Sequence, residues 1–182
     1  MCRWSTIGGG ANNNVYASYA SILGGQLSAV YAPLGSVCGG ARNYVYGYAA
    51  AVGGGRYNSA QSLYATIGGG QYNYVYSSMA VVAGGGYNFV YGYAATVGGG
   101  YGNRAYGSWS GVSGGNNNSA YGESSVVSGG SYNYAYSSWG TVGGGYYCKA
   151  GRTYGTVGGG YYNNNYGYAA TIGGGYSNYV YG

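Results

Sequence analysis

The sequence predicts an all-β fold: a parallel β-solenoid of twelve 15-residue coils, with two short strands in each coil. The first observation is a Gly-Gly pair that recurs every 15 residues, from Gly9-Gly10 to Gly174-Gly175, without an insertion or deletion. The second is the alternation of small or β-branched residues with polar or aromatic ones, which is typical of strands. The third is composition: 44 of the 182 residues are Gly, 30 are Tyr and only 4% are charged. Neither a core of large aliphatic side chains nor an ordinary disordered chain fits that composition.

The repeat also defines the domain organisation. When position 1 of the repeat is placed at Thr6, the chain contains eleven full repeats and a twelfth that stops at its twelfth position, Gly182. We therefore expect residues 6–182 to form a single solenoid domain and residues 1–5 to form an N-terminal lead-in that completes a coil. An α-helix is a poor alternative, because no 3.6-residue period is present and each interior Gly would cost about 1 kcal/mol.

Two columns of apolar residues locate the strands within each coil. Position 2 is Ile or Val in all twelve repeats, and position 10 is Val or Ala in eleven. Strands are expected at positions 14–2 and 7–11, for example at residues 94–97 and 102–106, with positions 15, 2 and 4 and positions 8, 10 and 12 facing inward. The Gly pair at positions 4 and 5 is expected to turn the chain with a positive φ.

A column of asparagines is expected inside the solenoid. Position 8 is Asn in ten repeats. Parallel strands stack about 4.8 Å apart, so identical residues of successive coils lie above one another and can form a ladder of side-chain amides. The predicted ladder consists of Asn13, Asn43, Asn58, Asn73, Asn88, Asn103, Asn118, Asn133, Asn163 and Asn178.

All tyrosines fall at outward or corner positions of the repeat, namely 6, 7, 9, 11, 13 and 14. Positions 7, 9 and 11 predict three parallel outward columns on one face. Position 11 predicts an assembly or binding face, made of Tyr16, Tyr31, Tyr46, Tyr76, Tyr91, Tyr106, Tyr121, Tyr136, Tyr166 and Tyr181. Positions 13 and 14 predict an aromatic corner, whose rings include Trp4, Tyr19, Tyr64, Trp109, Trp139 and Tyr154. Long contiguous aromatic patches usually mark an interface, and Tyr combines a rigid apolar body with a polar tip.

The repeat also resembles that of a known family. One copy of its motif reads Ala95-Thr96-Val97-Gly98-Gly99-Gly100 and continues through Asn103, Ala105 and Gly107, and another spans 170–175 with Asn178 and Val180. Over residues 6–182 the repeat resembles the head repeats of trimeric autotransporter adhesins, the YadA-like family. The resemblance implies a left-handed parallel β-roll, often trimeric, that is displayed on a cell surface and used in adhesion.

The residue types exclude several kinds of catalytic site. The chain has no His and no Asp, and Glu123 is its single acidic residue. Neither paired-carboxylate catalysis nor a Ser-His-Asp triad can therefore form within one chain, and no metal site is expected from one carboxylate and three dispersed thiols. The sequence predicts a non-enzymatic protein without a cofactor.

The cysteines and the charges predict little further chemistry. Cys38 and Cys148 lie seven coils apart, roughly 34 Å at the strand spacing, which is too far for a disulfide within one solenoid. We interpret the cysteines as tolerated small residues, with an intermolecular thiol at Cys2 as the alternative. The net charge of +5 comes from scattered basic residues that make no stripe for nucleic acid, and no apolar run of 18 residues predicts a membrane span.

Three functions are compatible with the aromatic surface. The first is self-association as an extracellular or surface fibre, the second is an adhesin head that binds glycans or a host surface, and the third is an ordered array that binds ice or mineral. The third would need regular Thr columns, but position 1 is Thr in only six repeats. Arg3, Trp4 and Ser5 occupy the three positions that the last repeat lacks, which predicts either head-to-tail joining of copies or a segment of a longer solenoid. We expect a self-assembling structural protein, with an adhesin head as the alternative.

Overall fold

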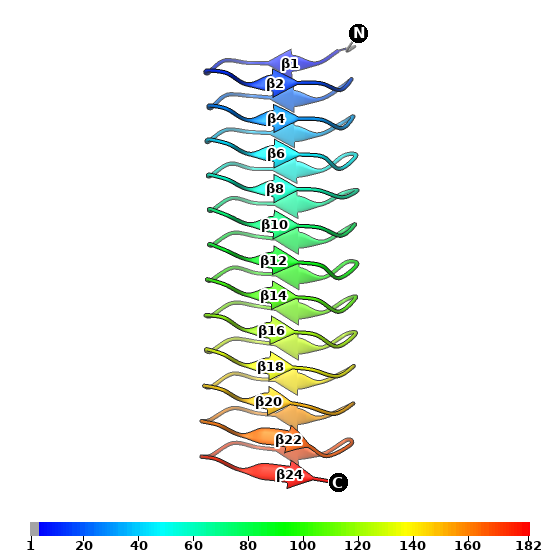
Figure 1. The fold of residues 1–182 in the computed structure, drawn as a ribbon, viewed down its shortest axis with the longest axis vertical. Helices are drawn as coiled ribbons and strands as arrows, with labels where there is room; N and C mark the ends of the chain where they lie inside the picture. Colours follow the sequence, from blue (N-terminus) through cyan, green and yellow to red (C-terminus); the bar gives the residue numbers. More distant parts are fainter. Residues whose placement is uncertain (1–3) are drawn as a thin grey trace.

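The computed structural model describes residues 4–182 and shows a parallel β-solenoid of twelve coils (Figure 1). Residues 1–3 lie outside the described residues, and so do two predictions that concern them: an intermolecular thiol at Cys2 and a contact of Arg3 in head-to-tail joining. The odd-numbered strands form one 12-stranded sheet, in the order β1 (Thr6–Ile7), β3 (Ser21–Ile22), β5 (Ser36–Val37), β7 (Ala51–Val52), β9 (Thr66–Ile67), β11 (Val81–Val82), β13 (Thr96–Val97), β15 (Gly111–Val112), β17 (Val126–Val127), β19 (Thr141–Val142), β21 (Thr156–Val157) and β23 (Thr171–Ile172). The even-numbered strands form the other, in the order β2 (Asn14–Val15), β4 (Ala29–Val30), β6 (Tyr44–Val45), β8 (Ser59–Ala60), β10 (Tyr74–Val75), β12 (Phe89–Val90), β14 (Arg104–Ala105), β16 (Ser119–Ala120), β18 (Tyr134–Ala135), β20 (Lys149–Ala150), β22 (Asn164–Tyr166) and β24 (Tyr179–Tyr181).

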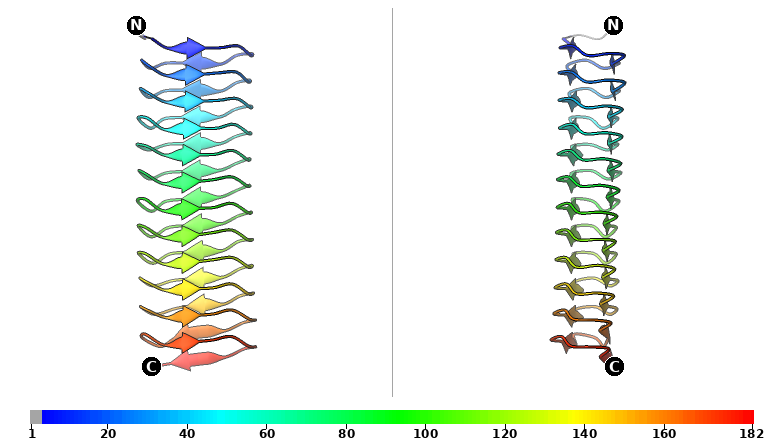
Figure 2. Two further views of the ribbon diagram at one scale, coloured as in Figure 1. Left: turned by 180° about the vertical axis from the view of Figure 1, so that it is seen from behind. Right: turned by 90° about the vertical axis from the view of Figure 1, so that its left-hand side faces the viewer.

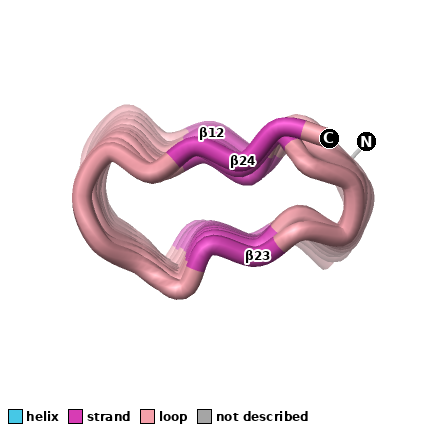
Figure 3. The backbone as a smooth tube through the Cα atoms, turned by 90° about the horizontal axis from the view of Figure 1, so that it is seen from below, coloured by secondary structure: helices cyan, strands magenta, loops and turns pink. Residues whose placement is uncertain are grey.

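Every coil repeats the register of the one before it. Val82 pairs with Val97 in the odd sheet, and Val75 pairs with Val90 in the even sheet, both in parallel and both 15 residues apart. The stack is straight and flat when it is seen from the side (Figure 2), and each coil is a flattened loop whose two strands face each other across a narrow interior (Figure 3). The all-β fold class and the 15-residue coil predicted from the sequence are confirmed.

The strands are shorter than the sequence predicted. They occupy positions 1–2 and 9–10, and only β22 and β24 extend to position 11. The reason is a left-handed backbone at positions 7 and 14: φ is +69° at Gly102 and +55° at Trp109. A residue in this conformation turns the chain and cannot continue a strand. The turn at position 7 is preceded by a single parallel bridge at position 6, such as Gly86 with Tyr101, which continues the coil-to-coil pairing.

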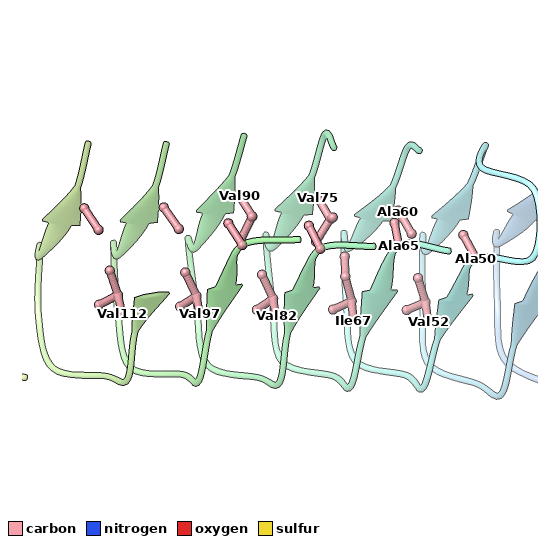
Figure 4. Close-up of a cluster of buried hydrophobic side chains, with 14 of the residues drawn as sticks. Ala50, Val52, Ala60, Ala65, Ile67, Val75, Val82, Val90, Val97 and Val112 are labelled. Atoms are coloured by element: carbon pink, nitrogen blue, oxygen red, sulfur yellow. The ribbon is translucent and has the colours of Figure 1, made fainter. Parts of the chain in front are cut away.

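The core consists of small and β-branched side chains from both sheets. Val82 and Val97 of the odd sheet face Val75 and Val90 of the even sheet (Figure 4), and all four are completely buried. The Gly column at position 4 was expected to face inward as well, and that expectation is wrong. A Cβ added at Gly84 would meet no atom within 4 Å, because the strand has ended before this position and alternation no longer applies.

Candidate functional site: an aromatic face over an asparagine ladder

The ladder asparagines connect successive coils, but they do so through the backbone. The Oδ1 atom of Asn103 accepts a hydrogen bond of 2.9 Å from the backbone N–H of Asn118 in the next coil. Its Nδ2 donates to the carbonyl oxygens of Gly99 in its own coil, at 2.8 Å, and Gly115 in the next, at 3.0 Å. The amide-to-amide ladder expected from the sequence is therefore wrong in its partners. The corner glycines place their carbonyl oxygens within reach of each Nδ2 group, so the amide closes the turn as well as joining the coils.

Two repeats replace the asparagine, and the ladder weakens there. The Oγ atom of Ser28 still accepts from the backbone N–H of Asn43, at 3.2 Å. The thiol of Cys148, which is buried, makes only long contacts with the carbonyl oxygens of Tyr146, at 3.8 Å, and Gly160, at 3.6 Å. Both Cys148 and the exposed Cys38 are free thiols.

The position-11 tyrosines form stacks along the outer surface of the even sheet. Ring centroids of consecutive members lie 4.6 Å apart for Tyr106 and Tyr121, and 5.3 Å apart for Tyr121 and Tyr136. Three stacks result, namely Tyr16 to Tyr46, Tyr76 to Tyr136, and Tyr166 with Tyr181. Most of these side chains are more than one-third exposed, so stacking leaves part of each ring accessible to solvent.

The two further columns expected at positions 7 and 9 widen this face. Position 9 places Tyr74 beside Tyr76, with 6.0 Å between ring centroids, and position 7 stacks Tyr57 on Tyr72 at 4.7 Å. We call the outward rings of positions 7, 9 and 11 together the tyrosine face.

A pair of arginines flanks the tyrosine face in the third and fourth coils. The Cζ atoms of Arg42 and Arg56 lie 5.1 Å and 4.9 Å from the centroid of the Tyr57 ring, which is within cation–π range. Arg42 also donates from Nη1 to the Tyr57 hydroxyl. Since Glu123 is the chain's single acidic side chain and lies five coils from Arg42 and four from Arg56, no acidic side chain neutralises this pair.

The aromatic corner is less continuous than the tyrosine face. Tyr93 and Trp109 meet edge to face at 5.9 Å, and Trp139 stacks on Tyr154 at 5.1 Å. The corner rings named from the sequence are all exposed: Trp4, Tyr19, Tyr64, Trp109, Trp139 and Tyr154. Because the bulky side chain alternates between positions 13 and 14, the corner consists of separate ring pairs and not a single stack.

Four of the position-11 phenols hold their protons more tightly than free tyrosine does. Burial raises the pKa of Tyr46, Tyr76, Tyr106 and Tyr136 above the ordinary value of 10.0, and repulsion between neighbouring phenolates raises it further. The face is therefore uncharged at neutral pH apart from its few basic residues.

Within residues 4–182, no group of three or more His, Cys, Asp or Glu side chains comes together in a way that could hold a metal ion. In the same residues, no helix has the length and apolarity needed to cross a membrane. Neither a protein-family model nor a curated protein sequence matches the chain. The structure thus supports the solenoid that the adhesin-head resemblance implies, and it places two unusual surfaces on that solenoid: the tyrosine face and the aromatic corner.

Proposed function

We propose that the chain is a non-enzymatic structural protein that associates with copies of itself, through the tyrosine face, into an extracellular or cell-surface fibre. The observation that carries the proposal is the one-sided distribution of the rings. Positions 7, 9 and 11 line the even sheet with tyrosines, whereas positions 1 and 3 on the odd sheet contain none. A contiguous aromatic surface of this length is rare on a monomer and is typical of an interface.

A second copy of the chain is the partner that best matches this surface. The rings recur once per coil, so a copy laid alongside brings ring against ring at every coil without any change in spacing. Each aromatic pair contributes about 0.5–1.5 kcal/mol beyond the area it buries, and these contributions accumulate along the rod.

Lateral contacts between the tyrosine faces of neighbouring copies are the proposed route to a fibre. The location outside the cell rests on the resemblance to adhesin heads.

The proposal is tested by comparing assembly of the parent chain with that of two matched triple variants. The first carries Tyr91→Gln, Tyr106→Gln and Tyr121→Gln, because Gln61 shows that position 11 accepts this residue. The second carries Val81→Thr, Thr96→Ala and Val126→Thr on the odd sheet. Sedimentation velocity and negative-stain microscopy are recorded over a concentration series, with circular dichroism to check the fold.

We expect the parent and the odd-sheet variant to assemble as concentration rises. The tyrosine-face variant should need a concentration at least about tenfold higher to assemble, which corresponds to a loss of about 1.4 kcal/mol in the free energy of association. A parent chain that stays monodisperse at every concentration would overturn the proposal, and so would a tyrosine-face variant that assembles as readily as the parent.

Adhesion is the second candidate function, and the aromatic corner favours it. Its rings are highly exposed and project as separate pairs, such as Tyr93 with Trp109, rather than as one continuous surface. Exposed Trp and Tyr rings of this kind suit stacking on sugar rings. A glycan array probed with the non-assembling tyrosine-face variant separates the two functions: selective binding that Trp109→Ala and Trp139→Ala abolish supports adhesion, and an empty array opposes it.

A further inference from the structure

The tyrosine face is interrupted in the fourth coil, and the interruption leaves a hollow of about 370 Å³. Position 9 of this coil is Ser59 and position 11 is Gln61, so two rings are missing side by side. The hollow is lined by Tyr44, Tyr46, Tyr57, Ser59, Gln61 and Tyr74. We propose that it is a binding site for a planar aromatic anion of about two fused or linked rings. The proposal does not depend on self-assembly.

The height of the hollow matches one flat ring system. In the unbroken stacks, neighbouring ring centroids are 4.7 Å apart for Tyr31 and Tyr46, and 4.8 Å apart for Tyr76 and Tyr91. Tyr44 and Tyr74 line the hollow from the third and fifth coils, so roughly 9.6 Å separates them at a strand spacing of about 4.8 Å. A planar ligand in the fourth coil therefore stacks on both neighbours at the separation that the tyrosines themselves adopt.

The width of the hollow selects a ligand of two rings. Its wall toward the third coil consists of Tyr44 and Tyr46, whose centroids are 6.4 Å apart, and Tyr74 lines it from the fifth coil. The wall toward the third coil is thus two rings wide. A single ring would cover half of that wall, whereas a bicyclic ligand covers both of its rings and contacts Tyr74 on its other face.

Polar groups lie at the floor and at one side. Ser59 is buried, and its Oγ atom accepts a hydrogen bond of 3.3 Å from Gln61 Nε2, which leaves the remaining amide atoms to meet a polar substituent. At the side formed by Tyr57 stand Arg42 and Arg56, which no carboxylate neutralises. Guanidinium groups bind carboxylate, sulfonate and phosphate oxygens, so the ligand is expected to be an anion with its charge directed toward this side.

The other interruption of the position-11 column shows that a missing ring alone does not create such a site. It falls at Gly151, where an added Cβ would lie 2.5 Å from Tyr166 Cδ1. The Tyr166 ring therefore covers the space that Gly151 leaves. In the fourth coil the Gln61 side chain and the buried Ser59 keep the two walls apart, and no neighbouring ring has moved in.

The test uses naphthalene-2-sulfonate as the probe and isothermal titration calorimetry as the readout, at protein concentrations where sedimentation shows one dispersed species. Cyclohexanesulfonate controls for charge without a flat ring, and 2-naphthylmethylammonium controls for the ring without negative charge. We expect saturable binding of one naphthalenesulfonate per chain and at least about tenfold weaker binding of either control. Equal binding of cyclohexanesulfonate, or no binding of the naphthalene probe, overturns the proposal.

One single variant is expected to weaken binding at the site, and another is expected to create a second site. Gln61→Tyr completes the column with the residue found there in ten coils, so it should fold as the parent does and weaken binding at least about tenfold. Tyr121→Gln should create a second site, because Ser119 already occupies position 9 of that coil and the rings of Tyr106 and Tyr136 would form the walls.

The charged side is tested separately. Arg42→Gln should weaken binding of the probe by about threefold to fivefold, which is the range of an exposed ion pair.

Unchanged affinity in Gln61→Tyr, with circular dichroism equal to that of the parent, shows that the probe binds elsewhere on the tyrosine face and overturns the assignment.

Discussion

Replacement of one ladder asparagine measures how far the solenoid depends on its inner hydrogen bonds. In Asn103→Ala, the buried N–H of Asn118 loses its acceptor, which costs about 1–3 kcal/mol, and the bond to Gly99 O, worth about 0.5–1.5 kcal/mol net, disappears. The carbonyl of Gly115 keeps its bond from the Tyr101 N–H. The free energy of unfolding should therefore fall by roughly 2–4 kcal/mol.

Urea unfolding followed by circular dichroism measures this loss, and amide hydrogen exchange at Asn118 locates it. Asn103→Ser should lose less, because Ser28 shows that a hydroxyl in this column still accepts from the next coil. Thr96→Ala is the matched control: it lies on the exposed surface of the same coil, Ala51 occupies the same column, and its effect should stay within about 0.5 kcal/mol. If Asn103→Ala is as stable as Thr96→Ala, the ladder does not stabilise the stack.

Three further predictions follow from the same geometry. Cys148→Asn should raise the free energy of unfolding by about 1–2 kcal/mol, since it supplies the Asn163 N–H with an acceptor; an unchanged urea midpoint contradicts this. Gly85→Ala should destabilise the fold by at least about 2 kcal/mol, because φ is +84° at this residue and the new Cβ would lie 2.2 Å from the Gly100 carbonyl oxygen. Gly84→Ala is the control: its Cβ meets nothing within 4 Å, so it should be tolerated in the same thermal unfolding assay. The raised tyrosine pKa values make a contribution to stability that is fully present below pH 10.0 and is lost as pH rises through the folded-state values. Tyrosinate absorbance should therefore rise at higher pH than in free tyrosine, and unfolding should follow. Titration at the same pH as free tyrosine would refute this.

The fold class could be predicted because a solenoid repeats its constraints twelve times. Inward positions 2 and 10 admit only side chains that fit a narrow interior, so their columns can be recognised from the sequence alone. The strand limits could not be predicted by alternation, because positions 7 and 14 adopt a left-handed backbone even where the residue is Tyr, Trp or Met. One signal was available: among the described residues, neither position contains Val, Ile or Thr, whose branched Cβ disfavours this conformation.

The candidate site was predictable in its residues and less so in its partners. Position 8 had to be an inward polar column, but which groups Asn103 would bind depends on where the corner carbonyls of Gly99 and Gly115 point, and that is decided by turn geometry. The three-column width of the tyrosine face was predicted, but the direction of its position-7 side chains was not, because position 7 was assigned to a strand. As a left-handed turn residue, Tyr57 projects beside Arg42 and Arg56 instead.

The stacking of coils restricts which side chains fit in the interior, but it leaves the outward position 11 free to vary. Each residue found at that position produces a different surface. Tyr continues the stack at the coil spacing, Gln61 keeps two walls apart and leaves a hollow, and Gly151 allows Tyr166 to cover the gap. None of these choices alters the pairing of the strands beneath, which keep the same register through both interruptions. A change of one outward side chain can therefore replace a continuous ring stack with a hollow at little cost to the fold, because the backbone bonds between coils do not involve that side chain and the core and the asparagine ladder lie on the other side of the sheet.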